Sequence, residues 1–424
     1  MVESVVVVGG SMSGLINAIQ LQRQGRNVTV LEQESASERS SYGYGVSYMV
    51  TVQAFLKEND RTGALRSIPS EELHYSLGRY ENLFTGKKKT EVTSWGYLYR
   101  ILRANFDGFA SKACPKPPPA AKGSGMGDYR GGKKVTGLID GNNRVTLEYI
   151  DVLDGKRDTI VADLVIGADG FNSTIRNLVQ APFNSQYAGY VAWRGIIPES
   201  QVSASAAAHF ANGMSFDFFR RSYIICYIIP TDDGAYDPGE RLLNWVWYFN
   251  VHDGSWDMTD IFSDVNGMTH QNTVPRGSIR PEVWDRIRAD AVPRLAAPFA
   301  EILSKTKEPF VSKINDLICE SPRHLGGKVV LVGDAFCTLR PHTGAATEQG
   351  AIHCRMMAAL RSGEKTAKEW ERDVWTVSRQ SFLASRVVGE LGQGTILSFL
   401  AALFWYVLFL FTKTPEKKMK ARTT

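Results

Sequence analysis

Three glycine-containing junctions, each placed after a run of aliphatic residues, constrain the fold of this chain most strongly. They are 9–14 (Gly-Gly-Ser-Met-Ser-Gly), 166–170 (Ile-Gly-Ala-Asp-Gly) and 331–344, which begins Leu-Val-Gly-Asp-Ala and ends Arg-Pro-His-Thr-Gly. Each precedes a segment expected to be helical. A strand that ends in a tight turn and enters a helix is the building unit of parallel α/β sheets. Together the junctions predict a sheet that holds a dinucleotide along its length.

The first junction has the pattern of a βαβ unit. Residues 4–8 are a β-branched run typical of a buried parallel strand, and residues 15–22 have apolar positions at helical spacing. The turn between them lets a pyrophosphate approach the backbone at a helix N-terminus, where amides and the dipole favour anions. Glu32 ends the second strand, at the position where an acidic side chain would accept hydrogen bonds from the two hydroxyls of a ribose. Ser11 replaces the middle glycine of the usual pattern, and the alternative is a turn without a ligand.

Composition limits the function classes. The chain of 424 residues can form one large or two intimate domains, and its net charge of +5 includes no basic cluster interleaved with aromatics in its body. Nucleic acid is therefore not expected as a partner. The five cysteines predict reduced thiols in a cytosolic setting, and no Cys/His spacing predicts a metal site. The first strand begins almost at Met1, so no signal peptide is expected.

The pattern of residues divides the chain into blocks. Residues 1–182 alternate strands and helices, and residues 183–275 change to aromatic-rich alternating runs that predict an antiparallel sheet. Helical spacing returns within residues 276–390, and residues 391–424 form a hydrophobic helix with a basic tail. We expect an α/β fold with a Rossmann-like domain in two parts, an interleaved antiparallel substrate domain and a C-terminal helical segment.

On these motifs the chain resembles the group A FAD-dependent aromatic monooxygenases, in the branch of 2,6-dihydroxypyridine hydroxylase and its fungal relatives. The resemblance covers about residues 4–390 and rests on the three junctions with residues 190–195 and 244–248. It implies non-covalent FAD in the Rossmann-like domain, with NADPH or NADH as transient reductant. It implies hydroxylation of an aromatic or heteroaromatic small molecule by dioxygen, through a flavin hydroperoxide.

The resemblance also assigns cofactor contacts. Glu32 would bind the adenosine ribose, Arg100 the pyrophosphate or ribityl region, and Val135 the adenine through its backbone. Asp169 would serve both FAD and the nicotinamide cofactor, and Asp334 the ribityl chain. Arg100 as a solvated helix residue and Asp169 as a turn residue are the alternatives. The full predicted set is Gly9, Gly10, Ser11, Ser13, Gly14, Glu32, Arg100, Val135, Asp169, Asp334, Gly344 and Ala345.

Two further features concern the flavin ring and the substrate. Gly344 and Ala345 would present amides to the ring, and Ala346 stands where relatives usually have glycine. Tyr227 and His342 are predicted as a catalytic proton relay, with an orienting loop role as the alternative for His342. The aromatic sheet supplies candidate pocket walls, about half of which should be core. These are Trp193, Tyr227, Trp247 and Tyr248.

The C-terminal segment 395–411 contains no charge and is followed by Lys413, Lys417, Lys418, Lys420 and Arg422. Its length is at the lower limit for a membrane span. We expect the segment to hold the protein on the cytoplasmic face of a membrane, by dipping into one leaflet, lying in the interface or spanning. The alternative is burial against the FAD-binding domain or in a homodimer.

Two other functions fit the same motifs. A flavin-dependent epoxidase of a prenylated or polyprenyl substrate would suit a membrane-associated tail. A flavin-binding oxidase or scaffold without oxygenation is the second alternative, which Ala346 and the tail keep open. The residues that shape the pocket, and hence the substrate, are not identified by the sequence.

Overall fold

The computed structural model describes residues 2–35, 44–65, 67–78, 80–219 and 221–412. A six-stranded sheet forms the first body, with every neighbouring pair parallel except β17 and β18. In spatial order its strands are β17 (Arg323–His324), β18 (Val329–Leu331), β10 (Leu164–Gly167), β1 (Ser4–Val8), β2 (Asn27–Leu31) and β6 (Gly127–Arg130). The parallel pairing confirms the Rossmann-like expectation.

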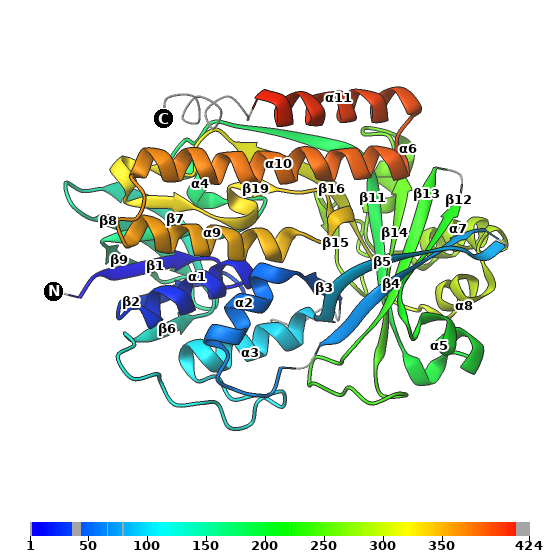
Figure 1. The fold of residues 1–424 in the computed structure, drawn as a ribbon, viewed down its shortest axis with the longest axis horizontal. Coiled ribbons are helices and arrows are strands. Elements are labelled where there is room, and N and C mark those ends of the chain that lie inside the picture. The colour runs from blue at the N-terminus through cyan, green and yellow to red at the C-terminus, as the bar shows by residue number, and fades with distance from the viewer. Residues whose placement is uncertain (1, 36–43, 66, 79, 220, 413–424) are drawn as a thin grey trace, which may run out of the picture.

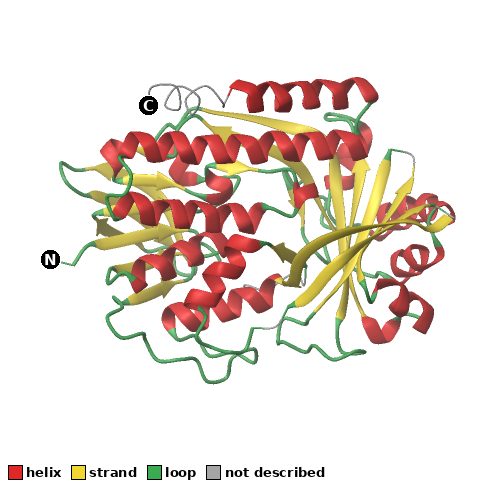
Figure 2. Cartoon of the chain, viewed as in Figure 1, coloured by secondary structure: helices red, strands yellow, loops and turns green. Residues whose placement is uncertain are grey.

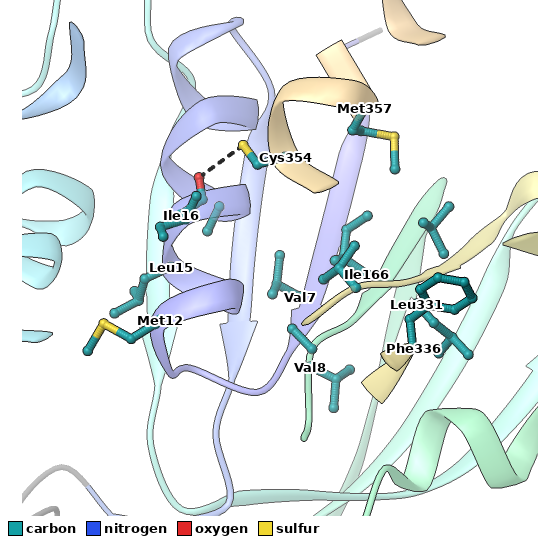
Figure 3. Close-up of a cluster of buried hydrophobic side chains, with 14 of the residues drawn as sticks. Val7, Val8, Met12, Leu15, Ile16, Ile166, Leu331, Phe336, Cys354 and Met357 are labelled. Carbon is teal, nitrogen blue, oxygen red and sulfur yellow. Dashed lines mark hydrogen bonds between the residues drawn. The ribbon is translucent and has the colours of Figure 1, made fainter. Parts of the chain in front are cut away.

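The residues of β1 explain why it is a central strand. Val5 to Val8 are all buried, because helix α1 (Met12–Arg23) packs on β1 and β2 and touches α3 (Trp95–Asp107) and α9 (Ala346–Arg361). Figure 3 shows this core behind the first turn, where Val7, Ile166 and Leu331 lie close together and the Cys354 thiol is 3.6 Å from the Ile16 carbonyl oxygen of α1. The turn after β1 therefore rests on a packed support.

A second body is built on a larger, mostly antiparallel sheet, separated from the first in Figure 2. Its main path is β15 (Thr273–Val274), β16 (Phe310–Cys319), β11 (Phe183–Pro198), β14 (Leu242–Asn250), β13 (Ser222–Ile229), β12 (Gly213–Phe219), β4 (Ile68–Leu77), β5 (Tyr80–Ser94) and β3 (Gly45–Tyr48), with β19 (Cys337–Thr338) paired to β16. Segments far outside residues 183–275 thus complete this sheet. The interleaving that the sequence predicted is present.

The remaining elements cover the two bodies. A small sheet of β7 (Lys133–Asp140), β8 (Val145–Asp151) and β9 (Arg157–Ala162) contacts β1 and β2. The other helices of the two bodies are α2 (Val50–Asn59), α4 (Thr174–Leu178), α5 (Ala204–Phe210), α6 (Trp256–Phe262), α7 (Pro281–Ala291) and α8 (Ala297–Lys305). α5, α7 and α8 lie against the far side of the large sheet in Figure 1, where they cover a second apolar core.

Two long helices end the described chain. α10 (Ala367–Gln393) begins at a capping box formed by Thr366 and Glu369, and α11 (Ile396–Thr412) folds back along it as the outermost helix in Figure 1. None of the residues of α11 is buried. Among the described residues, no helix is both long and apolar enough to cross a membrane.

Candidate functional site

The first glycine turn has the shape of an anion cradle. Gly9 has a φ of 99°, and a Cβ there would lie 2.5 Å from the Ala168 carbonyl oxygen. A Cβ on Gly14 would overlap the Gly9 carbonyl oxygen. Ser11 is the N-cap of α1, but its side chain makes no capping hydrogen bond. The turn therefore brings the backbone amides at the start of α1 close to any ligand at this edge of the sheet. Such a helix start is suited to binding a pyrophosphate.

Glu32 faces this turn from the end of β2. Its carboxylate accepts hydrogen bonds from the Gly10 amide at 2.7 Å and from the Glu34 amide at 3.0 Å, and the residue is buried. The Lys133 amide donates to the Glu32 carbonyl oxygen, which ties β7 to this edge. Val135 is buried on β7 where a bulge interrupts the ladder. Glu32 and Val135 thus lie on joined segments, as an adenosine site requires.

Asp169 of the second junction acts as a local cap. Its carboxylate accepts from the Ser173 hydroxyl at 2.5 Å and from the Ile175 amide at 3.1 Å, which holds the start of α4. Burial raises the pKa of Asp169, and the Ser173 hydrogen bond opposes that rise. Asp169 also lies beside Gly9. The turn role is visible in the geometry, and the nicotinamide role stays a prediction.

The third junction contains two polar groups without a protein partner. Burial raises the pKa of Asp334 to about 6, and within the described chain no hydrogen bond reaches its carboxylate. The buried Thr343 hydroxyl likewise has no hydrogen-bond partner in the described structure. Unpartnered buried polar atoms are unfavourable unless a ligand satisfies them. A polyhydroxylated flavin side chain fits this part of the site.

The predicted flavin loop is joined to the second body. Gly344 has a φ of 64°, and its carbonyl oxygen accepts from the Ser47 hydroxyl of β3 at 3.2 Å. Ala345 is the N-cap of α9 and Ala346 its first residue, and no side chain caps this end. The amides that begin α9 therefore point toward the junction of the two bodies.

His353 is a residue that the sequence did not single out. The Gly333 amide donates to His353 Nδ1 at 3.0 Å, so Nε2 carries the ring proton and donates to the Ser378 hydroxyl at 2.8 Å. Burial lowers the pKa of His353 to about 4, which keeps it neutral. His353 orients the loop that carries Asp334. The position of His353 in the sequence did not indicate this role, because its partners Gly333 and Ser378 come from distant segments.

The two arginines of α3 have different surroundings. One Arg100 nitrogen lies 3.3 Å from the Asp233 carboxylate near the surface. Arg103 is buried, donates to Tyr99 Oη at 2.7 Å and places its guanidinium carbon 3.5 Å from the centre of the Tyr129 ring. Tyr129 Oη in turn lies 3.5 Å from the Gly10 carbonyl oxygen. Arg103 is thus the α3 arginine that supports the glycine turn, and the Arg100–FAD contact stays a prediction.

His342 sits in a cage of tyrosines on the facing side of the large sheet. Its Nε2 lies 2.6 Å from Tyr190 Oη, its Nδ1 is hydrogen-bonded to Tyr223 Oη, and its ring centre lies 4.4 Å from that of Tyr248. Burial, with the nearby Arg340 charge, lowers the pKa of His342 to about 3. Tyr227, the predicted partner, makes no hydrogen bond to His342 and lies against Gly45 instead.

A buried ion network fixes the segment before His342. Arg340 Nε lies 2.8 Å from the Asp316 carboxylate of β16, and Arg340 Nη1 lies 2.7 Å from Glu390 of α10. Arg386 of α10 also binds Asp316, at 2.7 Å. Asp316 is fully buried, and a buried negative charge is strongly unfavourable unless it is paired, so the two arginines stabilise the ionised carboxylate. The loop bearing His342 is therefore held from two elements.

Two predicted pocket walls belong to the core instead. Trp193 and Trp247 point to the opposite face of the sheet, where Trp193 packs 5.3 Å from Trp284 of α7 and both are almost fully buried. About half of the four candidates were expected to be core, and alternation could not say which, because it identifies two faces without showing which one is covered. Tyr227 and Tyr248 lie on the other face, toward β3 and His342.

A Rossmann-like cofactor sheet with a facing antiparallel sheet is the architecture that the sequence resemblance implied. A family model described as FAD binding domain-like matches residues 187–316. A curated relative, 2,6-dihydroxypyridine 3-monooxygenase of Paenarthrobacter nicotinovorans, is 27% identical over 84% of this chain and 82% of its own. Salicylate hydroxylase of Pseudomonas putida is 23% identical over 84% of this chain and 76% of its own.

The comparison with solved structures agrees. The structure of 2,6-dihydroxypyridine-3-hydroxylase from Arthrobacter nicotinovorans superposes with a TM-score of 0.77 and 25% identity, covering 93% of this chain and 94% of that one. The resemblance to the group A aromatic monooxygenases is therefore confirmed, and the chain is an FAD-dependent aromatic hydroxylase that uses NAD(P)H. When bound, FAD would supply the redox chemistry, namely acceptance of a hydride from NAD(P)H and activation of dioxygen.

Proposed function

We propose that the substrate is an aromatic or N-heteroaromatic ring that already carries a hydroxyl group, and that His342 with Tyr190 and Tyr223 moves the proton of that hydroxyl. The observation that carries the proposal is the pair of short contacts at the two ring nitrogens of His342. A neutral imidazole has one donor and one acceptor nitrogen, so it can pass a proton between two phenols without becoming charged. The relatives named for dihydroxypyridine, hydroxynicotinate and salicylate support this substrate class.

For the cofactor we propose the contacts that the sequence suggested. The contacts of these residues in the structure support the proposal. The turn 9–14 would hold the pyrophosphate, Glu32 the adenosine ribose and Val135 the adenine. Asp334 would bind the ribityl chain, since its half-buried carboxylate accepts no hydrogen bond from the described residues. Gly344 and Ala345 would present amides to the flavin ring.

The test is a substrate screen on FAD-loaded protein. Hydroxypyridines and phenols are expected to stimulate NAD(P)H oxidation and to yield a product carrying one labelled atom from dioxygen. Methoxy analogues of the same rings, which lack the proton, should stimulate less. A prenylated alkene converted to its epoxide would establish the alternative epoxidase. Peroxide as the only product with every ring would establish the oxidase.

We also propose that α11 lies on an anionic lipid surface at the cytoplasmic face of a membrane. Large side chains are exposed along it, including Leu397 at 79% and Phe411 at 75%, and a shallow apolar groove of about 380 Å³ runs along the helix. An apolar surface of this kind is unusual in a soluble monomer. The basic residues that follow the helix in the sequence complement anionic headgroups of the cytoplasmic leaflet.

A flotation experiment separates a lipid surface from a dimer contact. The full chain should float with vesicles that contain phosphatidylserine, less with neutral vesicles, and not at all after removal of residues 395–424. Ending the chain at Gly394 retains the Gln393 carbonyl oxygen, which accepts from Arg221 and Asn250. A full-length dimer that ignores vesicles and dissociates on truncation would overturn the proposal.

A further inference from the structure

Arg194 is a cation without a counter-ion on the sheet face that meets His342. It lies on β11, and one of its nitrogens donates to the Ser312 hydroxyl of β16. Among the described residues no carboxylate pairs with it. The buried arginines Arg103 and Arg340, in contrast, each bind a carboxylate directly. An arginine has five N–H donors, so most of those on Arg194 lack a charged acceptor.

The surroundings of Arg194 are aromatic. Its guanidinium carbon lies 5.7 Å from the centre of the Phe310 ring, and Tyr44, Tyr227 and Tyr248 are near enough to affect its charge. Removal from water lowers the pKa of Arg194, and these three phenols oppose the shift. Arg194 is half-buried, and a guanidinium partly removed from water is stabilised by an anion that reaches it. None of the residues that the structure describes supplies such an anion.

The position of Arg194 places it on the substrate side. Tyr190 and Arg194 lie on the same face of β11, and Trp193 lies on the opposite face. Tyr190 contacts His342. Tyr227 lies on that face next to Gly45, and Ser47 of the same short strand contacts Gly344 in the flavin loop. Tyr227 and Tyr248 both lie near the guanidinium, so a ring bound against this face would be near it as well.

We propose that Arg194 binds an acidic oxygen of the aromatic substrate, either an oxygen anion on the ring or a ring carboxylate. The inference rests on the proposed function and narrows its substrate class to anionic hydroxyarenes. The guanidinium fork matches two oxygens or a single anionic oxygen, and charge-assisted hydrogen bonds of this kind are strong in a dry site. Arg194 would thus hold the ring while the relay at His342 handles its proton.

The experiment measures ligand binding to FAD-loaded protein through perturbation of the flavin spectrum and through thermal shift. The probes are 2-hydroxybenzoate against 2-hydroxybenzamide, for the carboxylate, and a hydroxypyridine against its methoxy analogue, for the ring oxygen anion. Arg194→Gln should raise the Kd of the anionic probe of one pair or both roughly 10- to 100-fold. The Kd of the neutral partner should change little.

The controls separate this inference from other roles of the residue. Arg194→Lys keeps the charge and should recover part of the binding. Arg276→Gln removes an arginine that is paired with Glu308 and should change no Kd. Equal losses for charged and neutral probes, or loss of FAD itself, would overturn the inference. Wild-type protein that binds no hydroxylated ring at all would refute the proposed function, whereas equal wild-type affinity within each pair would refute only the role of Arg194.

Discussion

Tyr190 and His342 are joined by a contact of 2.6 Å between the phenol oxygen and Nε2, although the two residues are 152 positions apart in the sequence. The opposite ring nitrogen is bonded to Tyr223. Burial raises the pKa of both phenols and lowers that of His342, so all three groups stay neutral at working pH. Tyr190, His342 and Tyr223 can therefore pass a proton from one to the next, but none of them holds a net charge.

Substitution of His342 tests this relay. His342→Gln is expected to lower the rate of coupled hydroxylation on the order of 100-fold, because the proton path is broken, while reduction of the bound FAD by NAD(P)H is unchanged. Stopped-flow absorbance separates the two steps. Tyr187→Phe is the matched control, since Tyr187 lies on β11 with Tyr190 but donates its hydroxyl to the Val251 carbonyl oxygen and not to His342. Equal slowing of reduction and hydroxylation would contradict the relay.

The two buried histidines should make stability depend on pH. Their pKa values are depressed to about 3 for His342 and about 4 for His353, against 6.5 in the unfolded chain. Below pH 6.5 the unfolded chain binds more protons than the folded one, so the free energy of unfolding falls as the pH drops. Each histidine contributes a slope of about 1.4 kcal/mol per pH unit between 6.5 and its folded pKa.

The contribution of one histidine can be isolated by comparison at several pH values. His353→Gln should lose part of the stability at pH 7, where the wild-type hydrogen bonds are intact, and should show a shallower fall from pH 6.5 to 5. Urea unfolding followed by circular dichroism at each pH measures both effects. Parallel curves for wild type and variant would show that His353 titrates normally.

Asp334 is expected to act in the opposite direction. Its pKa is raised to about 6 in the fold against 3.8 unfolded, so the folded apoprotein binds the extra proton and loses stability as the pH rises from about 4 to 6. Asp334→Asn should therefore stabilise the apoprotein at pH 8 by roughly 1–3 kcal/mol and have little effect near pH 4. Affinity for FAD should fall at the same time. Asp290→Asn, at an exposed position on α7, is the control.

Local sequence was sufficient for the cofactor half of the fold. The β-branched run before Gly9 and the apolar spacing after it lie within one βαβ unit, so the strand, the turn and α1 were predicted correctly. The antiparallel sheet was predicted as well, because alternation of aromatic residues is a local signal.

Contacts between distant segments could not be predicted in the same way. Tyr190 and Tyr223 both reach His342 because β11, β14 and β13 pair side by side, and this arrangement exists only in the folded chain. For the same reason the sequence could not tell which of the four candidate aromatics are core: Trp193 is covered by helix α7, which comes from a later segment. The sequence around Arg194 did not indicate its proposed role. That no described carboxylate pairs with Arg194 becomes visible only when all residues near it in the fold are known.

Glu32 offers the most direct test of cofactor orientation. Glu32→Ala should weaken FAD binding roughly 10- to 100-fold, because a charge-assisted contact to the adenosine ribose is lost. FMN has no adenosine, so its affinity should change little. Fluorescence titration of the apoprotein with each flavin gives both constants.

The structure adds a second role for Glu32 that the test has to separate. The carboxylate also accepts from the Gly10 amide at 2.7 Å, so its loss could collapse the turn itself. Glu32→Gln keeps an oxygen for that amide and should retain the turn while weakening the ribose contact. Glu34→Ala, at an exposed neighbouring acid, should leave both flavins unaffected. If Glu32→Ala lowers FAD and FMN affinity equally, Glu32 supports the turn and does not bind the ribose.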